Sequence, residues 1–175
     1  MAKLSVESGG VTLAGEEEGE GIAVVLLHGL TATRRYVVMG SRTLERSGHR
    51  VIAYDARGHG ASTPAPDPDA YDYDDLVEDL RAVLDGRGIE RAVLAGASMG
   101  AHTAARLALD APERVAGLVI ITPAFDPDAP REEELARWDA LSEGLRSGGV
   151  DGFVGAYGEP PVPEQWRETI DKVLR

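Results

Sequence analysis

The chain has 175 residues, enough for one domain with a sizeable hydrophobic core. Its composition, 43% hydrophobic and 27% charged, is ordinary for a soluble globular protein, and its net charge of −12 argues against nucleic acid or an anionic membrane surface as a partner. The absence of cysteine excludes disulfides, thiolate metal sites and a cysteine nucleophile. No apolar run approaches the roughly 20 residues that cross a bilayer, and no signal-peptide core is present, so we expect a cytoplasmic protein.

The N-terminal region predicts a β-hairpin. Residues 3–8 alternate between polar and apolar side chains, as in an edge strand, and 11–14 can pair back after a Gly-Gly turn. The acidic, glycine-rich residues 16–21 are expected to form an exposed turn.

An alternation of strands and helices follows. Continuous apolar runs predict strands buried on both faces, at 22–27, 50–54, 91–95 and 118–121. Helices are predicted between them, at 32–47, 73–84 and 99–110. This order is typical of a parallel sheet with helices on both faces, whose ligands bind at the carboxyl ends of the strands. His28, Asp55, Ser98 and Thr122 come at those ends.

The pattern changes after residue 125, because no further apolar strand is found. Residues 131–146 predict an amphipathic helix with Leu135, Trp138, Leu141 and Leu145 on one face. A loop over 148–158 and a second helix over 164–174 are expected after it.

Residues 96–100 read Gly-Ala-Ser-Met-Gly, between a predicted strand and a predicted helix. In that context G-x-S-x-G is typical of a nucleophile on a sharp, strained strand-to-helix turn. Small residues are needed on both sides of Ser98 because the strand and the helix approach closely there. The following helix would offer N–H groups and a positive dipole end to a developing oxyanion.

Three motifs at strand ends together resemble the α/β-hydrolase superfamily, in its branch of serine-nucleophile esterases, lactonases and haloperoxidase-like proteins. They are Leu27-His28-Gly29-Leu30, residues 55–62 (Asp-Ala-Arg-Gly-His-Gly-Ala-Ser) and residues 96–100. The resemblance implies an α/β fold with a mostly parallel doubly wound sheet. It also implies a hydrolase core over residues 1–125 and the start of a helical cap over 126–175.

The resemblance also implies roles for individual residues. Ser98 matches the nucleophile, and the backbone N–H groups of Met99 and Leu30 match the oxyanion hole. His28 and Gly29 match the loop that carries Leu30, while Gly96 and Gly100 match the small residues around the nucleophile. Arg57 and His59 match a structural loop under the site.

The catalytic acid and histidine of the family have no clear match. In this family they follow the nucleophile in the chain, and the histidine lies near the C-terminus. The four histidines here are His28, His49, His59 and His102, and none follows the predicted cap. His102, four residues after Ser98 on one helix, and Asp126, just after the last strand, are the weak alternatives for base and acid. The chain thus looks truncated within the cap.

The expected function is therefore a serine hydrolase acting on a small carboxylic ester, thioester or lactone through an acyl-enzyme at Ser98, incomplete as this chain alone. Ser98 argues against the aspartate-nucleophile branch, which includes epoxide hydrolases. A non-catalytic binding module with the same fold is the alternative. A doubly wound nucleotide- or flavin-binding domain is disfavoured because G-x-G-x-x-G and a P-loop lysine are missing. No cofactor and no metal are implied, and the expected partner is a small-molecule substrate.

Strand 118–121 matches the sixth of eight strands in the family. Without further strands it would form an apolar sheet edge, which is a template for association. We therefore expect self-association through this edge or marginal stability.

Overall fold

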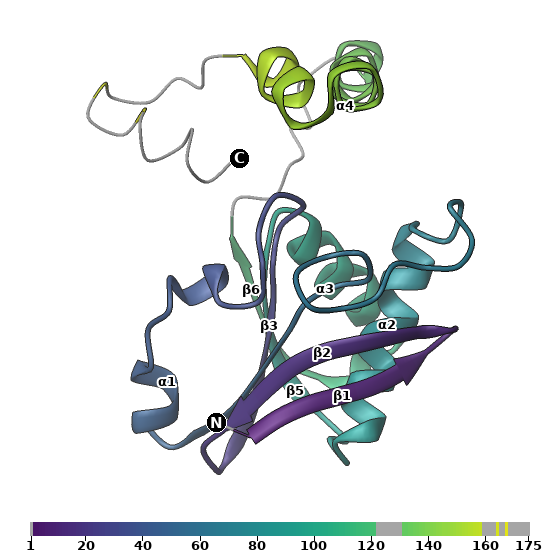
Figure 1. Cartoon of the computed structure of the whole chain (residues 1–175). Coiled ribbons are helices and arrows are strands. Elements are labelled where there is room, and N and C mark those ends of the chain that lie inside the picture. Colours follow the sequence, from purple (N-terminus) through teal and green to yellow (C-terminus); the bar gives the residue numbers. More distant parts are fainter. Residues whose placement is uncertain (1, 122–130, 159–163, 165–166, 168–175) are drawn as a thin grey trace. The chain divides into compact units, whose positions relative to one another are not determined.

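A six-stranded sheet organises the first part of the chain, with the strand order β1-β2-β4-β3-β5-β6 (Figure 1). The computed structural model describes residues 2–121, 131–158, 164 and 167. The strands are β1 (Ala2–Ser8), β2 (Val11–Glu18), β3 (Ile22–Leu27), β4 (His49–Tyr54), β5 (Ala92–Ala97) and β6 (Val115–Ile121). The chain divides into two units, Met1–Ala124 and Phe125–Arg175.

The strand directions confirm the predicted architecture. β1 and β2 form the expected antiparallel hairpin, which joins the sheet through antiparallel pairing of β2 with β4. The four strands β4, β3, β5 and β6 are parallel. The carboxyl ends of these parallel strands therefore meet at one edge, where the motifs around His28, Asp55 and Ser98 begin.

Two helices cover one face of the sheet: α2 (Tyr73–Gly86) and α3 (Met99–Asp110) (Figure 1). Their apolar side chains, among them Leu80 and Leu107, share a buried cluster with the sheet residues Val25, Ile52 and Leu94. A capping box holds the start of α2, since the Asp72 side chain accepts the N–H groups of Asp74 and Asp75.

The other face of the sheet is covered by short elements, which corrects the predicted helix 32–47. That segment contains a 3₁₀ turn at Tyr36–Val38 and a single helical turn, α1 (Thr43–Arg46). The chain reverses between them, where Met39 and Gly40 adopt positive φ angles of 48° and 74°. Met39 is 81% exposed, whereas Val37 and Leu44 pack on the buried residues of β3 and β4. The apolar spacing thus came from two separate turns.

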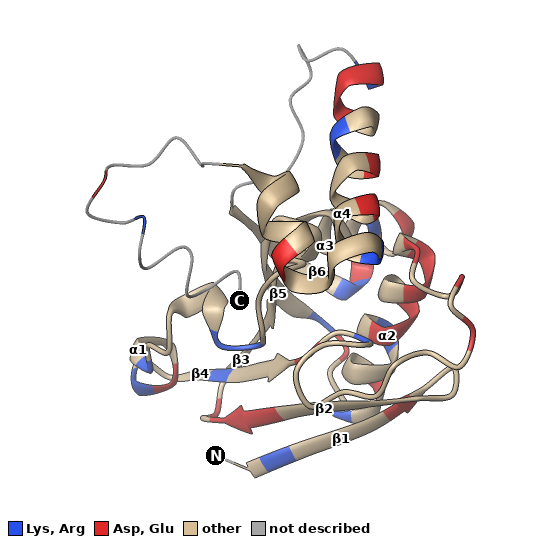
Figure 2. Cartoon of the chain, turned by 45° about the horizontal axis from the view of Figure 1, so that its top comes forward, with Lys and Arg blue, Asp and Glu red and all other residues tan. Residues whose placement is uncertain are grey.

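The expected acidic turn at 16–21 is also wrong in its first half. β2 continues to Glu18, and Glu16–Glu18 pair with β4. Charge explains the extension, because Glu17 receives ion pairs from Arg50 and Arg87. These arginine contacts lower the pKa of the Glu17 carboxyl, although its partial burial opposes them. Figure 2 shows the acidic residues gathered at this end of β2.

The last strand, β6, ends the sheet of the described residues. Leu118, Val119 and Ile120 are 42%, 46% and 42% exposed, although their side chains alternate between the two faces. In the described part of the chain, the prediction that residues 118–121 are buried on both faces is therefore wrong, whereas the predicted apolar sheet edge is present.

The second unit contains one long helical segment, α4 (Arg131–Tyr157), interrupted at Gly149, whose φ is 59°. The predicted helix 131–146 is present, but the expected loop 148–158 is largely helical up to Tyr157. Of the predicted apolar face, Leu141 is buried, while Leu135, Trp138 and Leu145 are exposed. The predicted helix 164–174 falls almost entirely outside the described residues. No helix among those described is long and apolar enough to cross a membrane.

Candidate active site

Ser98 stands at the junction of β5 and α3 in an unusual backbone conformation. Its φ and ψ angles are 49° and −112°, and Ser98 and Met39 are the two non-glycine residues with positive φ in the described chain. Such a conformation costs about 1–3 kcal/mol and persists only when the surrounding structure enforces it. The Ser98 side chain does not cap α3, although serine is a favoured N-cap residue. The Ser98 hydroxyl at this strained turn is therefore not used to cap α3.

Two glycines make this sharp turn possible. A Cβ atom on Gly96 would lie 2.2 Å from the Gly100 carbonyl oxygen, and a Cβ on Gly100 would lie 2.2 Å from the Leu27 carbonyl oxygen. The Ser98 N–H group also donates to the Ile121 carbonyl at 3.0 Å, which attaches the turn to β6. The small residues predicted around Ser98 are therefore required by close backbone packing.

Two backbone N–H groups lie near this turn without a partner in the described part of the chain. They belong to Met99, the first residue of α3, and to Leu30, in the loop after β3. A Cβ on Gly29 would lie 3.4 Å from the Ser98 Cβ, so the Leu30 loop passes directly beside Ser98. The predicted nucleophile and both predicted oxyanion donors are thus close in space.

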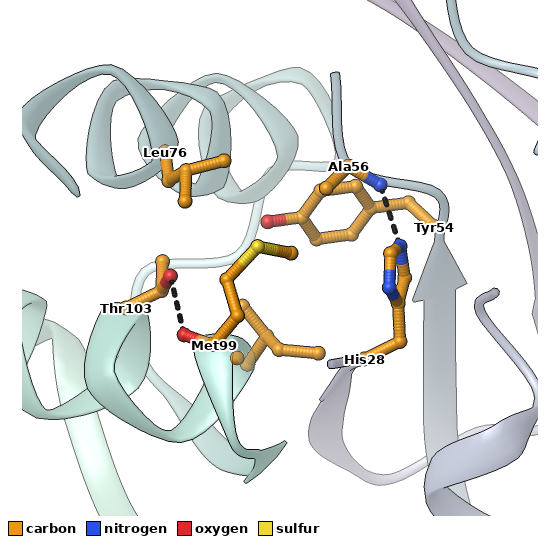
Figure 3. Close-up of a pocket in the computed structure, with 8 residues that line it drawn as sticks. His28, Tyr54, Ala56, Leu76, Met99 and Thr103 are labelled. Carbon is orange, nitrogen blue, oxygen red and sulfur yellow. Dashed lines mark hydrogen bonds between the residues drawn. The ribbon is translucent and has the colours of Figure 1, made fainter. Parts of the chain in front are cut away.

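His28 fixes the loop after β3, which carries Leu30, through two hydrogen bonds. Its ring is buried, its Nε2 accepts the Ala56 N–H at 2.9 Å, and its Nδ1 lies 2.8 Å from the Gly29 carbonyl oxygen (Figure 3). Only the neutral ring with its proton on Nδ1 can make both hydrogen bonds. The pKa of His28 is lowered chiefly by burial, which favours this neutral form.

The bond from His28 to Gly29 also orients the next peptide N–H. The C=O and N–H of a trans peptide point in opposite directions, so fixing the Gly29 carbonyl fixes the direction of the Leu30 N–H. The described peptide bonds are all trans. His28 thus acts on the loop as a scaffold, with neither ring nitrogen free to move a proton.

A small space of about 10 Å³ lies under the Ser98 turn, lined among others by Tyr54, Leu76, Met99 and Thr103 (Figure 3). Burial raises the pKa of the Tyr54 hydroxyl strongly. Tyr54 therefore remains protonated and is not a candidate base for Ser98.

Asp55, at the end of β4, is a structural carboxylate. It is fully buried and accepts hydrogen bonds from the backbone N–H groups of Arg34 (2.9 Å) and Ala61 (3.0 Å), as well as an ion pair from the Arg34 guanidinium. A Cβ on Gly60 would lie 2.3 Å from this carboxylate, so glycine is required there. These contacts join the loop after Asp55 to the loop after β3.

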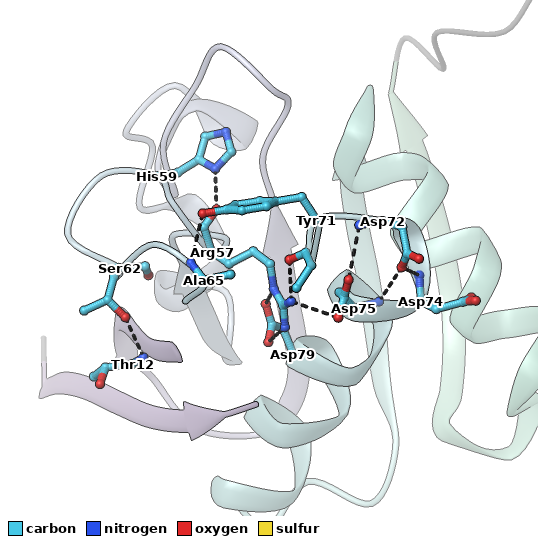
Figure 4. A network of polar contacts seen from close by, with 12 residues as sticks. Thr12, Arg57, His59, Ser62, Ala65, Tyr71, Asp72, Asp74, Asp75 and Asp79 are labelled. Atoms are coloured by element: carbon cyan, nitrogen blue, oxygen red, sulfur yellow. Dashed lines mark hydrogen bonds and ion pairs between the residues drawn. The ribbon is translucent and has the colours of Figure 1, made fainter. Parts of the chain in front are cut away.

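Arg57 anchors the same loop to α2 (Figure 4). Its guanidinium forms two hydrogen bonds with the buried carboxylate of Asp79, at 2.7 and 2.8 Å, and contacts Asp75 and the Ala70 carbonyl. The hydrogen bonds to Asp79 are the main cause of the raised Arg57 pKa. The motif matched to a structural loop is therefore rigidly held.

The weak candidates for acid and base do not complete the site. The His102 ring packs against Tyr73 of α2, with ring centroids 5.6 Å apart, and forms no hydrogen bond with the Ser98 hydroxyl, while the His102 backbone N–H donates to the Ser98 carbonyl at 3.1 Å. All four histidines lie in the described part of the chain, and none of their side chains forms a hydrogen bond with the Ser98 hydroxyl. Asp126 and Thr122 lie outside the described residues.

Sequence reasoning missed two supporting residues, Arg34 and Asp79. Asp79 had a detectable signal, since it lies on the apolar face of α2 between Leu76 and Leu80, where a charge needs a buried partner. Arg34 had no such signal, because its segment was predicted as helix. Among the described residues, no group of three or more His, Cys, Asp or Glu side chains could hold a metal ion.

Comparisons with known proteins agree with this geometry. Residues 22–154 match the family model described as alpha/beta hydrolase fold. The sn-1-specific diacylglycerol lipase ABHD11 of Mus musculus is 38% identical over 100 residues, which cover 57% of this chain and 32% of that protein. Epoxide hydrolase 1 of Siraitia grosvenorii is 32% identical over 95% of this chain and 51% of its own length.

A solved structure shows the same fold over nearly the whole chain. The thermophilic esterase from Thermogutta terrifontis superposes with a TM-score of 0.75 at 28% identity, covering 99% of this chain and 64% of the esterase. This chain therefore spans about a third to two thirds of the lengths of these three proteins. The matched family model, together with the strained serine turn, shows that the chain belongs to the α/β-hydrolase fold family.

Proposed function

We propose that this chain forms the nucleophile-bearing part of a serine hydrolase that acts on a small carboxylic ester, thioester or lactone. The observation that carries the proposal is the positive φ of Ser98 at a strand–helix junction, beside two N–H groups that have no partner among the described residues. The similarity to proteins named a lipase and an esterase supports an ester substrate. A serine nucleophile favours acyl transfer. It argues against epoxide opening, which is the reaction that the name of Epoxide hydrolase 1 of Siraitia grosvenorii indicates.

In the proposed reaction, the Ser98 Oγ attacks the carbonyl carbon of the substrate as its proton passes to a general base. The Leu30 and Met99 N–H groups donate hydrogen bonds to the oxyanion, and the positive end of the α3 dipole adds to its stabilisation. The tetrahedral intermediate expels the alcohol or thiol and leaves an acyl group on Ser98, which water then hydrolyses.

The general base is the missing component. A serine hydroxyl is a poor nucleophile until a positioned base accepts its proton. In the described part of the chain, no histidine side chain forms a hydrogen bond with the Ser98 hydroxyl, so we propose that the base and its acid partner are supplied from outside this chain. The chain alone should then react slowly.

A non-catalytic binding module is the second candidate, and the same observation favours it. Without a base, the Ser98 turn and its two N–H groups could hold a carbonyl or carboxylate oxygen without turnover. The two functions differ in whether Ser98 can form a covalent bond.

Reaction with a fluorophosphonate probe, measured by intact mass, separates these functions. We expect slow addition of one probe molecule, absent in Ser98→Ala and retained in Ser5→Ala, which alters an exposed serine in β1. A folded chain that adds no probe over many hours would favour the binding module. Probe addition that persists in Ser98→Ala would reject Ser98 as the nucleophile.

A further inference from the structure

His59 bridges two backbone carbonyl groups that belong to different loops. Its Nδ1 lies 2.9 Å from the Arg57 carbonyl oxygen, and its Nε2 lies 2.8 Å from the Leu30 carbonyl oxygen. Both acceptors are oxygens, so each contact requires an N–H on the ring. The doubly protonated ring donates to both carbonyls at once, while a neutral ring donates to one of them.

The Arg57 side of this bridge is fixed. The Arg57 guanidinium is held by Asp79, Asp75 and the Ala70 carbonyl, and its side chain is 3% exposed (Figure 4). The backbone N–H of His59 also donates to the Ala56 carbonyl at 3.0 Å. The ring of His59 therefore projects from a rigid part of the loop.

The Leu30 side of the bridge is the segment that carries a proposed oxyanion donor. The preceding carbonyl, of Gly29, is held by His28 and by the Ala32 N–H at 3.1 Å. The Leu30 carbonyl is held by His59. The two peptide planes that flank the Leu30 Cα are thus each fixed by a histidine.

We propose that His59 is a positioning residue of the oxyanion hole, which holds the Leu30 carbonyl so that the Leu30 N–H stays directed toward the reacting oxygen beside Ser98. This inference rests on the proposed function of Ser98 and Leu30. It assigns to the loop after β4 a role in transition-state stabilisation, without contact between His59 and substrate.

An oxyanion donor must be positioned precisely to stabilise the transition state. Loss of one such donor costs about 100- to 1,000-fold in rate, and displacement by about 1 Å can cost about 100-fold. The Leu30 side chain is 44% exposed and supplies little packing to fix its own backbone. On its C-terminal side, the contact of its carbonyl with His59 adds a side-chain restraint to the turn that the Ala32 N–H closes.

The test compares His59→Phe with His59→Gln in the full chain. Phenylalanine keeps a planar ring beside His28 but has no N–H, whereas the glutamine amide can donate to the Leu30 carbonyl. We expect His59→Phe to slow the maximal rate of fluorophosphonate addition to Ser98 by about 10- to 100-fold, with little change in probe affinity. His59→Gln should recover most of that rate. Equal rates in wild type and His59→Phe would overturn the proposal.

A second measurement is independent of any reaction at Ser98. Backbone ¹⁵N relaxation should show the order parameter of the Leu30 amide falling from about 0.85 to below about 0.6 in His59→Phe, with Ala101 of α3 unchanged. His59→Gln should keep the Leu30 value near that of wild type. If wild type adds no probe, the proposed hydrolase function fails in this chain. The positioning role is then decided by Leu30, and an unchanged order parameter in His59→Phe rejects it.

Discussion

The rings of His28 and His59 lie 5.0 Å apart between centroids, and each contacts the backbone of the loop that carries the other. His28 accepts the Ala56 N–H, and His59 lies within hydrogen-bonding distance of the Leu30 carbonyl. The loop after β3 and the loop after β4 are thus joined by two reciprocal contacts. The hydrogen bond from the Ala56 N–H to His28 requires a neutral His28 ring, so the stability of the protein should depend on pH.

Stability should decrease in mild acid because of His28. Burial lowers its folded-state pKa below the unfolded value of 6.5, so the unfolded chain binds more protons between the two values. The free energy of unfolding should therefore fall as the pH drops below about 6.5, and this loss is complete below the folded-state pKa. Carboxyls with lowered pKa values, such as Glu17, lose their contribution only at lower pH, below about 4.5.

Urea unfolding between about pH 7.5 and pH 5.5 measures this effect. The dependence on pH should be reduced in His28→Asn, which cannot titrate, and retained in His102→Gln, which alters a half-buried histidine on α3. An unchanged dependence in His28→Asn would assign the acid sensitivity to another group.

The Arg57–Asp79 pair should be essential for folding stability. Both side chains are buried, and Asp79→Ala leaves the Arg57 cation with the partly exposed Asp75 as its remaining carboxylate. Removing one partner of a buried pair costs about 3–5 kcal/mol, because the other charge stays desolvated. A decrease of that size should appear in the urea unfolding free energy.

The matched control is Glu78→Ala, one residue away on α2. Glu78 is 69% exposed and pairs with Arg81 on the surface, so its loss should cost less than about 1 kcal/mol. Comparable losses for Asp79→Ala and Glu78→Ala would show that burial does not determine the strength of the Arg57 contact.

The sequence predicted the regular core well because its signals were local and redundant. Strand 22–27 and helix 99–110 have the predicted bounds, since the apolar run begins directly after Gly21 and the helical spacing ends before Pro112. The helix 32–47 was wrong because apolar spacing alone cannot detect the chain reversal at Met39 and Gly40. The extension of β2 through Glu17 depends on Arg50 and Arg87, which are distant in sequence.

The candidate site was only partly predictable for a similar reason. A short motif identifies Ser98 and its glycines because their spacing follows from one turn. The hydrogen bond between His59 and Leu30 joins residues 29 positions apart and leaves no local pattern. Arg57 was matched to a structural loop, but the sequence does not reveal that its partner is Asp79, which was missed despite its place on an apolar helix face.

We propose that the exposed edge of β6 mediates self-association. β6 contains no charged residue, and its outer edge has no paired strand in the described part of the chain. Sedimentation velocity should show association that increases with protein concentration. Ile120→Lys should weaken it, because a lysine on an edge strand opposes strand pairing.

Leu109→Lys provides the control for added charge. Leu109 is 82% exposed and belongs to α3, not to the edge strand, so this variant should associate as wild type does. A wild-type chain that remains monomeric at all concentrations, or equal effects of the two variants, would reject the β6 edge as the interface.

The backbone strain at Ser98 should be measurable as stability. Glycine adopts positive φ without a steric penalty, whereas alanine keeps the Cβ that makes this conformation unfavourable. Ser98→Gly should therefore be more stable than Ser98→Ala by about 1–3 kcal/mol in urea unfolding, although both variants lose the hydroxyl. Neither variant should react with the fluorophosphonate probe.

Ser47 supplies the matched comparison, since its φ of −95° is accessible to any residue. There the order should reverse, with Ser47→Ala slightly more stable than Ser47→Gly because glycine loses more backbone entropy on folding. An opposite order of stability for the glycine and alanine variants at positions 47 and 98 would distinguish backbone strain at Ser98 from a general effect of glycine on the free energy of unfolding. Equal stabilities of Ser98→Gly and Ser98→Ala would mean that the Ser98 turn stores no strain. Ser98 would then be identified as a nucleophile by its reactivity with the probe alone.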